Sequence, residues 1–579
     1  MEKTKSTNKR KKKASTAAAP PIKSTKSSWC PLDHFEHLLD DAEADQLLDK
    51  SQLPPTQTEA TPFGRIHLPL CTAASKPPPL PNLDDLKPSL LAGLRGGLWS
   101  PEDPFWQALH SYRDLHYPLR PPAHEAAAQE EMLALHVANH LLRNRARVLA
   151  GNQRRQLDPQ AEARDQGLSR PQVLLLLPFR SAALRFVEAL ARLLFAGSAR
   201  ELVTNKKRFM DEFALAHAGP SEDKPADYRS LFAGNSDDCF RLGLGVAKKS
   251  LKLFLDFYSA DVLVASPLGL RMAIGAEGEG SHEWDFLASI QLVILDQADV
   301  FLMQNWAHVV HIFQHLHRQP KETHGQDLTR VRLWELNGWG AAYRQTVLLA
   351  SRATPELRAL HTRFARNYAG LAEWTPSFPK LGLLPALSPA INQVFYRFSA
   401  GSLEEEADAR FKFFLDKILP GLLNAGLSHT ALFIPSYLDF VRLRNHFKRE
   451  TLGAVQISEY SKPSKVARAR DMFFHGQKPF LLYSERAHFY RRYALRGIRQ
   501  LLFYQPPLIP DFYAELADAV AESAEASPDV QPRVLLLFTA SDALRLAPIL
   551  GPGRASTLIH SPDTTFTLNP TTNLLQHRP

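Results

Sequence analysis

The stretch VILDQADVFL, residues 293–302, decides the fold of this chain. The apolar run 292–295 leads directly into Asp296, Gln297, Ala298 and Asp299. A short, continuous apolar run is typical of a strand buried on both faces of a parallel sheet. In open parallel sheets, functional side chains gather where the strands end. The four residues after this run are therefore the first candidates for a site.

Further apolar runs of the same kind occur on both sides of this stretch. They are VLLLLP (173–178), DVLVASP (261–267), TVLLAS (346–351), TALFIP (430–435), FLLYS (480–484), LLFYQ (501–505) and VLLLF (534–538). Amphipathic stretches with helical spacing lie between them, among them residues 181–195. Strands that alternate with helices predict an α/β fold with doubly wound parallel sheets and right-handed crossovers. The proline-rich stretch 374–390 separates two groups of runs, so we expect two α/β domains divided near residue 385.

Composition divides the rest of the chain of 579 residues. Residues 1–60 are rich in Lys, Ser, Thr, Pro and Ala, which predicts a disordered basic tail. Proline clusters and aromatic residues make 61–123 a predicted strap on a domain surface. The first α/β domain is then expected over 124–384 and the second over 385–579.

The charge balance favours a polyanionic partner. Lys and Arg number 69 against 60 for Asp and Glu, a net charge of +9. Lys9, Arg10, Lys11, Lys12 and Lys13 form an unbroken basic run, which predicts a nuclear import signal or an RNA-contacting tail. The alternative is a solubilising tail that no receptor reads.

Other composition features exclude several classes of protein. The three cysteines are widely scattered, which suits a reducing compartment and offers no paired spacing for a metal. No apolar run approaches the roughly 18 residues of a membrane span, and the first residues lack the apolar core of a signal peptide. We expect no metal, no cofactor and no membrane association.

The segments that follow successive strands carry a resemblance. In order they are PFRSAALR, SPLGLR, DQAD and SR, then PSYLDFVRLRNHF, FFHGQKPFLLYSER and YQPPLIPDFYAEL. This order resembles the DEAD-box helicases, which implies two RecA-like domains. The longer segments DQGLSRPQVLLLLPFR, ADVLVASPLGLRMAIG and RGIRQLLFYQPPLIPDFYAEL, with the opening stretch, resemble the digestive organ expansion factor family.

That family resemblance covers roughly residues 100–579 and implies a role. Its members are helicase-like components of the small-subunit processome that act in 18S pre-rRNA maturation. The implied location is the nucleus and nucleolus. The implied partners are pre-rRNA, small nucleolar RNA and other processome proteins, in a large ribonucleoprotein complex.

The chemistry of ATP hydrolysis is not expected to survive. The fold needs a glycine-rich phosphate loop, but residues 124–170 contain only Gly151 and Gly167 and no lysine. GLGVAKKS (243–250) imitates such a loop at the wrong place in the order, so we interpret it as a basic loop leading into a helix. Gln297 replaces the carboxylate that would position water, and an amide accepts no proton. Asp296 and Asp299 are interpreted as caps on the turn and the following helix.

An RNA-binding face is still predicted. By resemblance, Arg180, Ser181, Ser266 and Arg271 occupy positions where helicases contact the phosphate backbone. Segment 484–499 interleaves aromatic residues with basic ones, as a phosphate-binding and base-stacking surface does. Its candidate residues are Arg486, Arg491, Arg492 and Arg496. The equally weighted alternative is a helix with a solvated basic side and an aromatic core side.

Three functions follow from these observations. The leading one is a catalytically inactive, DEAD-box-like scaffold that binds RNA during small-subunit assembly. The second is an active helicase whose lysine or arginine reaches the phosphates from elsewhere. The third is a protein-only interaction module, for which Trp106, Trp306 and the proline-rich strap would serve as contacts.

Overall fold

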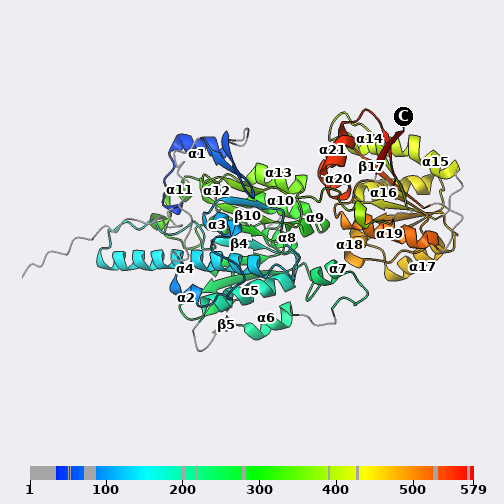
Figure 1. Cartoon of the computed structure of the whole chain (residues 1–579). Helices are drawn as coiled ribbons and strands as arrows, with labels where there is room; N and C mark the ends of the chain where they lie inside the picture. The colour runs from blue at the N-terminus through cyan, green and yellow to red at the C-terminus, as the bar shows by residue number, and fades with distance from the viewer. Residues whose placement is uncertain are drawn as a thin grey trace, which may run out of the picture.

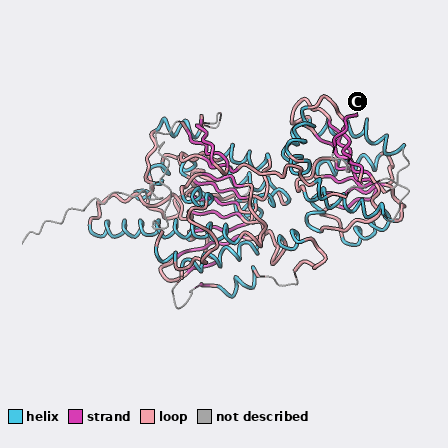
Figure 2. Tube along the Cα trace, in the orientation of Figure 1, coloured by secondary structure: helices cyan, strands magenta, loops and turns pink. Residues whose placement is uncertain are grey.

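The computed structural model describes residues 34–49, 51, 54–70, 86–196, 203–214, 219–276, 282–388, 391–424, 429–525, 532–569 and 574–578. The predicted import run at residues 9–13 lies outside these ranges. Two sheets organise the described part of the chain, and Figure 2 shows them as two separate groups of strands. None of the described helices combines the length and apolar character that crossing a bilayer requires.

The first domain contains an 11-stranded sheet. In spatial order its strands are β1 (Thr56–Thr61), β2 (Gly64–Pro69), β11 (Leu371–Trp374), β3 (Asp114–Tyr117), β10 (Gln345–Leu349), β9 (Leu292–Leu295), β4 (Val173–Leu176), β8 (Val262–Ala265), β6 (Arg241–Val246), β7 (Leu251–Leu253) and β5 (Val203–Thr204). The strands from β11 to β8 are parallel, and β2 and β6 flank them antiparallel. Parallel pairing brings the carboxyl ends of β3, β10 and β9 to one edge of the sheet.

Helices cover both faces of this sheet. Alternate residues of β4 and β9 enter two separate cores: Leu175 and Ile294 lie in one, and Leu176 and Leu295 in the other. Strands buried on both sides need apolar residues at every position, which explains the continuous runs in the sequence. The described helices of this domain are α1 (Asp41–Leu48), α2 (Pro88–Leu91), α3 (Pro104–His110), α4 (Ala127–Leu157), α5 (Arg180–Leu194), α6 (Lys206–Phe213), α7 (Ala226–Leu231), α8 (Pro267–Ile274), α9 (Ala298–Met303), α10 (Trp306–His315), α11 (Leu333–Leu336), α12 (Gly340–Tyr343) and α13 (Pro355–Phe364).

The second domain repeats this plan with an eight-stranded sheet. Its order is β14 (Ala454–Ile457), β15 (Phe480–Ser484), β13 (Thr430–Ile434), β16 (Gln500–Phe503), β17 (Arg533–Phe538), β12 (Asn392–Arg397), β18 (Thr565–Asn569) and β19 (Leu574–Arg578). The first six strands are parallel, β18 pairs antiparallel with β12, and β19 pairs antiparallel with β18. Its helices are α14 (Glu406–Phe413), continued by a π-helical turn (Phe414–Ile418) and α15 (Leu419–Asn424), then α16 (Tyr437–Arg449), α17 (Pro463–Phe474), α18 (Glu485–Arg491), α19 (Asp511–Glu525), α20 (Ala543–Leu550) and α21 (Pro552–His560).

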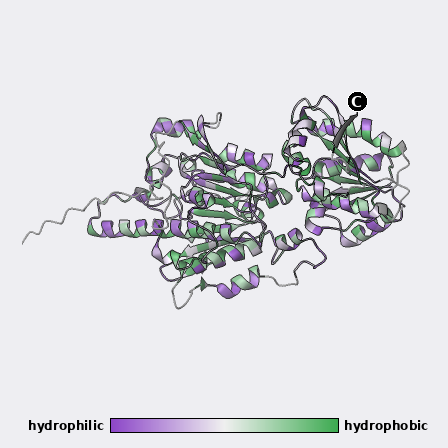
Figure 3. Ribbon diagram, viewed as in Figure 1, coloured by the Kyte–Doolittle hydropathy of each residue, from purple (hydrophilic) through white to green (hydrophobic). Residues whose placement is uncertain are grey.

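Both domains therefore have the predicted α/β, doubly wound, RecA-like architecture (Figure 1). Hydropathy follows the layers, with apolar strands inside and mixed helices outside (Figure 3). The switch from the first sheet to the second falls between β11 and β12.

The predicted strap 61–123 is not a surface strap. Its last strand, β3, lies between β10 and β11 inside the first sheet. Most of β2 pairs with the edge of β11 that faces away from β3. Trp106 on α3 is only 1% exposed and belongs to the core. The strap interpretation was wrong because β3, with the sequence DLHY, carries Asp114 and His116 and lacks a continuous apolar run.

Part of the predicted disordered tail is also ordered. Residues 41–48 form α1, which begins with a capping box between Asp40 and Glu43. Phe35, Leu39 and Leu47 are buried in the core of the first domain. Ala44 and Leu47, at helical spacing, form the buried side of α1.

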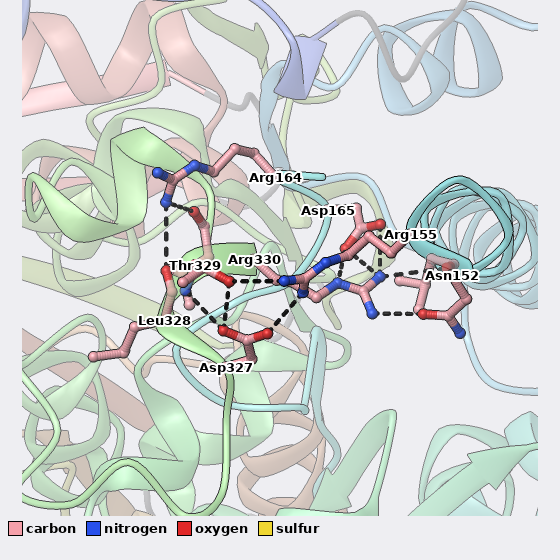
Figure 4. Close-up of polar contacts among 10 residues, drawn as sticks. Asn152, Arg155, Arg164, Asp165, Asp327, Leu328, Thr329 and Arg330 are labelled. Carbon is pink, nitrogen blue, oxygen red and sulfur yellow. Dashed lines mark hydrogen bonds and ion pairs between the residues drawn. The ribbon is translucent and has the colours of Figure 1, made fainter. Parts of the chain in front are cut away.

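The long helix α4 extends past the sheet and is held by a polar network (Figure 4). Arg330 donates to both carboxylate oxygens of Asp165, at 2.7 Å to Oδ1 and 2.8 Å to Oδ2, and to the side chain of Asn152 on α4. Arg155, also on α4, pairs with Asp327 at 2.8 Å. These contacts fix the segments before β4 and after α10 against the helix.

Candidate functional site

The site lies where β3, β9 and β10 end. The loop after β3, residues 118–126, has the sequence PLRPPAHEA and joins the strand to α4. Its backbone is held by hydrogen bonds from Ala350 N to Tyr117 O, at 3.0 Å, and from Arg120 N to Ala350 O, at 2.8 Å. In a parallel sheet of this type, the turn between the strand and the helix is the place of a phosphate-binding loop. Here it holds prolines and no glycine.

Arg120 projects from this loop onto Asp296 at the end of β9. Arg120 Nη2 donates to Asp296 Oδ2 at 2.9 Å, and Arg120 Nε donates to Oδ1 of the same carboxylate. The side chains are 4% and 6% exposed. Burial alone lowers the pKa of Arg120, but the charge and hydrogen bonds of Asp296 more than offset it, so the pKa is raised. The carboxylate that would hold magnesium is thus neutralised from within the chain.

Gln297 stands next to this pair with its backbone in the left-handed region, at φ 58°. Its side chain lies buried, and within the described part of the chain its amide nitrogen has no hydrogen-bond partner. Asp296 Oδ1 accepts from the Gln297 backbone N–H at 3.0 Å. The turn is therefore stabilised by Asp296, as expected for a cap on the turn.

Asp299 has a different role from the cap that the sequence predicted. It accepts from the backbone N–H of Ser351 at 3.1 Å and from Ser351 Oγ at 2.6 Å. The following residue, Arg352, donates to Leu508 O of the second domain at 3.3 Å. Asp299 thus links the ends of β9 and β10 rather than the first turn of α9.

A cavity of about 320 Å³ lies in front of these groups, between the two domains. The first domain lines it with Arg120, Gln297, Asp299 and Ser351, and the second with Arg492 among others. Residues from α7 complete the wall. Among the described residues, no cluster of three or more His, Cys, Asp or Glu side chains is arranged to hold a metal ion.

Helix α7 and its flanks cross from the first domain to the second (Figure 1). Asp227 forms an ion pair with Arg492, and Tyr228 Oη donates to Tyr490 O at 2.9 Å. Lys224 Nζ donates to Arg492 O at 2.9 Å. Phe232 packs against Phe489 with ring centroids 5.5 Å apart. This bridge fixes α18 against the first domain.

The candidate RNA-binding residues of the first domain are occupied by contacts within the chain. Arg180 pairs with Asp237 at 3.0 Å, and its backbone N–H donates to Asp237 O. Ser181 N–H donates to Asn235 O, which removes another donor that the start of α5 would offer a phosphate. Ser266 is fully buried and caps α8 through Gly269 N. Arg271 donates to Gly275 O.

The arginines of segment 484–499 fall into two groups. Arg486 donates to Met303 O and Gln304 O, at 2.8 and 2.7 Å, so it belongs to the contact between domains. Arg492 is 5% exposed and pairs with Asp227 and Glu515. Arg491 and Arg496 are exposed. The sequence could not separate these groups, because the pattern of basic residues is the same for both.

The structure places the GLGVAKKS segment and the loop equivalent to a phosphate-binding loop. GLGVAKKS lies on β6 and its turn, three strands away from β9, and leads into strand β7 rather than a helix. The sequence predicted the phosphate-loop position within 124–170, whereas the equivalent loop begins at residue 118. Arg120 was therefore missed, and its only sequence signal is a basic residue between two proline positions.

This pair of RecA-like domains, with an altered acidic motif at a strand end, defines a helicase-like protein. Comparisons with known proteins agree in detail. The family model "UTP25, NTP hydrolase-like domain" matches residues 112–372, and "Utp25, C-terminal domain" matches 384–568. The chain belongs to the UTP25 family. This is the predicted digestive organ expansion factor family under another name, so the predicted family is confirmed. The predicted nuclear, nucleolar location is also confirmed.

The similar relatives are named U3 small nucleolar RNA-associated protein 25, or its homolog. The Xenopus tropicalis protein is 43% identical over 78% of this chain and 60% of its own length, and the Homo sapiens protein is 42% identical over 78% and 61%. The Pyricularia oryzae protein is 38% identical over 85% of this chain and 70% of its own. The match thus spans about 60% of the length of the two vertebrate relatives.

Two solved structures of helicases also match. S. cerevisiae Dbp5 bound to RNA and ADP BeF3 is 13% identical, with a TM-score of 0.27 over 79% of this chain and 89% of that one. The yeast DEAD-box splicing factor Prp28 is 11% identical, with a TM-score of 0.28 over 84% of each chain. The RecA-like fold of the two domains is shown by the strand order of their sheets.

Proposed function

We propose that this chain is a catalytically inactive, DEAD-box-like scaffold of the nucleolar small-subunit processome. It would act in 18S pre-rRNA processing and small-subunit biogenesis, in contact with pre-rRNA or small nucleolar RNA and with other processome proteins. The name of its relatives, U3 small nucleolar RNA-associated protein 25, supports this assembly. The family model for residues 112–372 is called NTP hydrolase-like, so the state of the nucleotide site is the central question.

The observation that carries the proposal is the pairing of Arg120 with Asp296. Magnesium is held in such folds by a carboxylate at this strand end and by the phosphates of the nucleotide. Here the carboxylate is buried and bound by a guanidinium from the loop that would cradle those phosphates. A magnesium nucleotide would have to break this buried pair before its metal could reach Asp296, so the pair competes with nucleotide binding.

The contacts between the domains support a scaffold over a motor. A helicase cycle needs its two domains to separate and close. Here Phe179, Val300 and Met303 of the first domain lie in the hydrophobic core of the second. The α7 bridge adds the ion pair of Asp227 with Arg492. Apolar burial and this ion pair, in which Arg492 is the buried partner, together favour one fixed arrangement.

The test is calorimetry of the full chain with ATP and magnesium. We expect no binding isotherm at millimolar nucleotide. Gln297→Glu restores the missing carboxylate but not the phosphate loop, so we expect no ATP turnover from this variant. A magnesium-dependent isotherm, or turnover in Gln297→Glu, would overturn the inactive scaffold in favour of a helicase with an unconventional nucleotide site.

RNA binding is proposed for the exposed basic side of segment 484–499. Changing Arg491 and Arg496 to Glu leaves the buried Arg492 intact, so the variant should melt like the parent. Each lost phosphate contact removes about one unit from the slope of log affinity against log salt, so we expect a slope flatter by about two. Lys412→Glu/Lys417→Glu, exposed in the same domain, is the control.

The outcomes of the RNA experiment separate the remaining functions. Equal affinity and salt slope in parent and Arg491→Glu/Arg496→Glu would show that this segment is not the RNA surface. A parent chain with no RNA affinity at low salt would favour the protein-only interaction module.

A further inference from the structure

The strand β14 forms one edge of the second sheet, and its outer side has no neighbouring strand among the described residues. Phe480 N donates to Gly453 O, which sets the register of the ladder with β15. In a parallel ladder, alternate residues direct their N–H and C=O groups to the same side. Val455 and Ile457 therefore face β15, whereas Ala454 and Gln456 direct their backbone groups away from the sheet.

A groove of about 540 Å³ runs beside this edge. Its floor contains Phe447 and Leu482, and α16 forms one side. Ala454 lies in register with Phe480, on the face of the sheet that α16 covers, so its small side chain leaves the groove open. An extended peptide would fit this groove. Its backbone would pair with the free edge of β14, and every second side chain would enter the groove.

The charge of the groove is uniformly positive. Arg444, Lys448 and Lys478 line it, and no lining residue is acidic. Within the described part of the chain, neither Lys448 nor Lys478 has an ion-pair partner for its ammonium group. The adjacent carboxylate of Glu450 is engaged by Arg449 at 2.9 Å. The groove therefore favours carboxylates on whatever occupies it.

We propose that the β14 edge binds an extended acidic segment of a partner protein, which adds a strand to the second sheet. The backbone of Ala454 and Gln456 would pair with the added strand, and carboxylates at alternate positions would meet Lys448, Lys478 and Arg444. RNA fits less well, because its phosphate backbone has no regularly spaced N–H groups to pair with the outward carbonyl groups of the edge. This proposal is independent of the proposed function, since it requires neither the nucleotide site nor RNA binding.

The test uses the full chain and a fluorescein-labelled peptide of alternating Val and Glu, nine residues long. Gln456→Pro removes an outward N–H and is compatible with an edge strand, because the ladder with β15 does not use that group. Gln456→Thr keeps the N–H and is its control. We expect at least tenfold weaker peptide binding by Gln456→Pro and by Lys448→Glu/Lys478→Glu, and parent affinity for Gln456→Thr.

Three further measurements identify the occupant. Lys248→Glu/Lys249→Glu makes the same charge change at exposed positions of the first domain and should bind the peptide like the parent. On peptide binding, hydrogen exchange should slow at the amides of Ala454 and Gln456. A Val–Lys peptide of the same length should not bind.

Several results would overturn the proposal. One is a Val–Glu peptide that fails to bind the folded parent at millimolar concentration, or that binds all variants equally. Another is a single-stranded RNA that competes for the groove and loses affinity in Lys448→Glu/Lys478→Glu but not in Gln456→Pro, which would assign the groove to nucleic acid. A concentration-dependent dimer abolished by Gln456→Pro would assign the edge to a second copy of the chain.

Discussion

At the scale of the residue, Arg120 supplies the positive charge that a buried carboxylate needs. Asp296 lies buried at the end of β9, where an ionised carboxylate is costly unless a cation pairs with it. The guanidinium provides two parallel hydrogen bonds and a charge that is retained at every physiological pH. An acidic motif that serves chemistry in helicases therefore has a structural partner here.

The Arg120–Asp296 pair predicts a strong coupling between the two residues. Arg120→Met leaves the buried Asp296 without a cation, so the free energy of unfolding should fall by about 3–5 kcal/mol. Arg120→Met/Asp296→Asn removes both charges and should recover much of this loss. Urea unfolding of the parent, the single variants and the double variant measures the coupling.

The control for this cycle is Arg449→Met, which removes an exposed ion pair with Glu450. It should cost less than about 1 kcal/mol. If Arg120→Met lowers the free energy of unfolding no more than Arg449→Met does, the pair with Asp296 does not stabilise the site, and Arg120 would be free to leave Asp296 when a nucleotide binds.

At the scale of the element, β3 shows how a polar strand can hold a central position. Its Asp114 is buried, and its carboxylate accepts from Thr346 N on β10 at 2.5 Å. Burial raises the pKa of Asp114 from 3.8 to about 7, against the opposing effects of the Thr346 hydrogen bond and the charge of Arg344. The strand thus binds a proton more tightly than the unfolded chain does.

This raised pKa predicts a pH dependence of stability. Between about pH 4 and pH 7 the folded chain keeps the Asp114 proton that the unfolded chain has lost, so stability falls as the pH rises. The loss attributable to this group is on the order of 4 kcal/mol. Asp114→Asn should flatten the profile of unfolding free energy between these pH values.

Other variants calibrate the pH measurement. Burial also raises the pKa of Glu485 to about 7, so Glu485→Gln should remove a second share of the slope. Asp416→Asn, at an exposed position, should leave the profile unchanged. A profile for Asp114→Asn that superimposes on that of the parent would show that this carboxyl is ionised in the folded chain at all these pH values.

At the scale of the whole molecule, side chains of the first domain pack into the core of the second, which gives the two domains one relative arrangement. Met303 O accepts from both Arg486 Nε, at 2.8 Å, and Tyr490 Oη, at 3.2 Å. Helix α7 closes the opposite side of the same contact through Asp227 and Tyr228. These contacts hold α18 of the second domain against the first.

This arrangement predicts that α7 holds the domains together. Asp227→Ala/Tyr228→Ala removes the ion pair and the hydrogen bond, so small-angle scattering should show a larger radius of gyration and calorimetry should resolve two melting transitions. Arg229→Ala, exposed on the same helix, is the control and should match the parent. Scattering curves of Asp227→Ala/Tyr228→Ala and parent that coincide would mean that the apolar contacts of Met303 and Phe179 suffice.

The sequence by itself determined the central strands and the two-domain plan. Each strand buried on both faces requires apolar residues at every position, so β4, β8, β9 and β10, and their counterparts in the second domain, are visible as continuous runs. The sequence also showed that Gln297 interrupts the acidic motif. The absence of a glycine-rich loop within residues 124–170 followed from residue types alone.

Only the tertiary structure decided which side chains meet. Arg120 and Asp296 are separated by 176 positions, and no periodicity links residues on different strands of a parallel sheet. The strand β3 escaped detection because it carries polar residues whose partners, such as Thr346 for Asp114, the sequence does not identify. Arg491 and Arg492 are adjacent and chemically identical, yet one is exposed and the other buried. Burial depends on the packing of distant segments, and that information exists only in the folded chain.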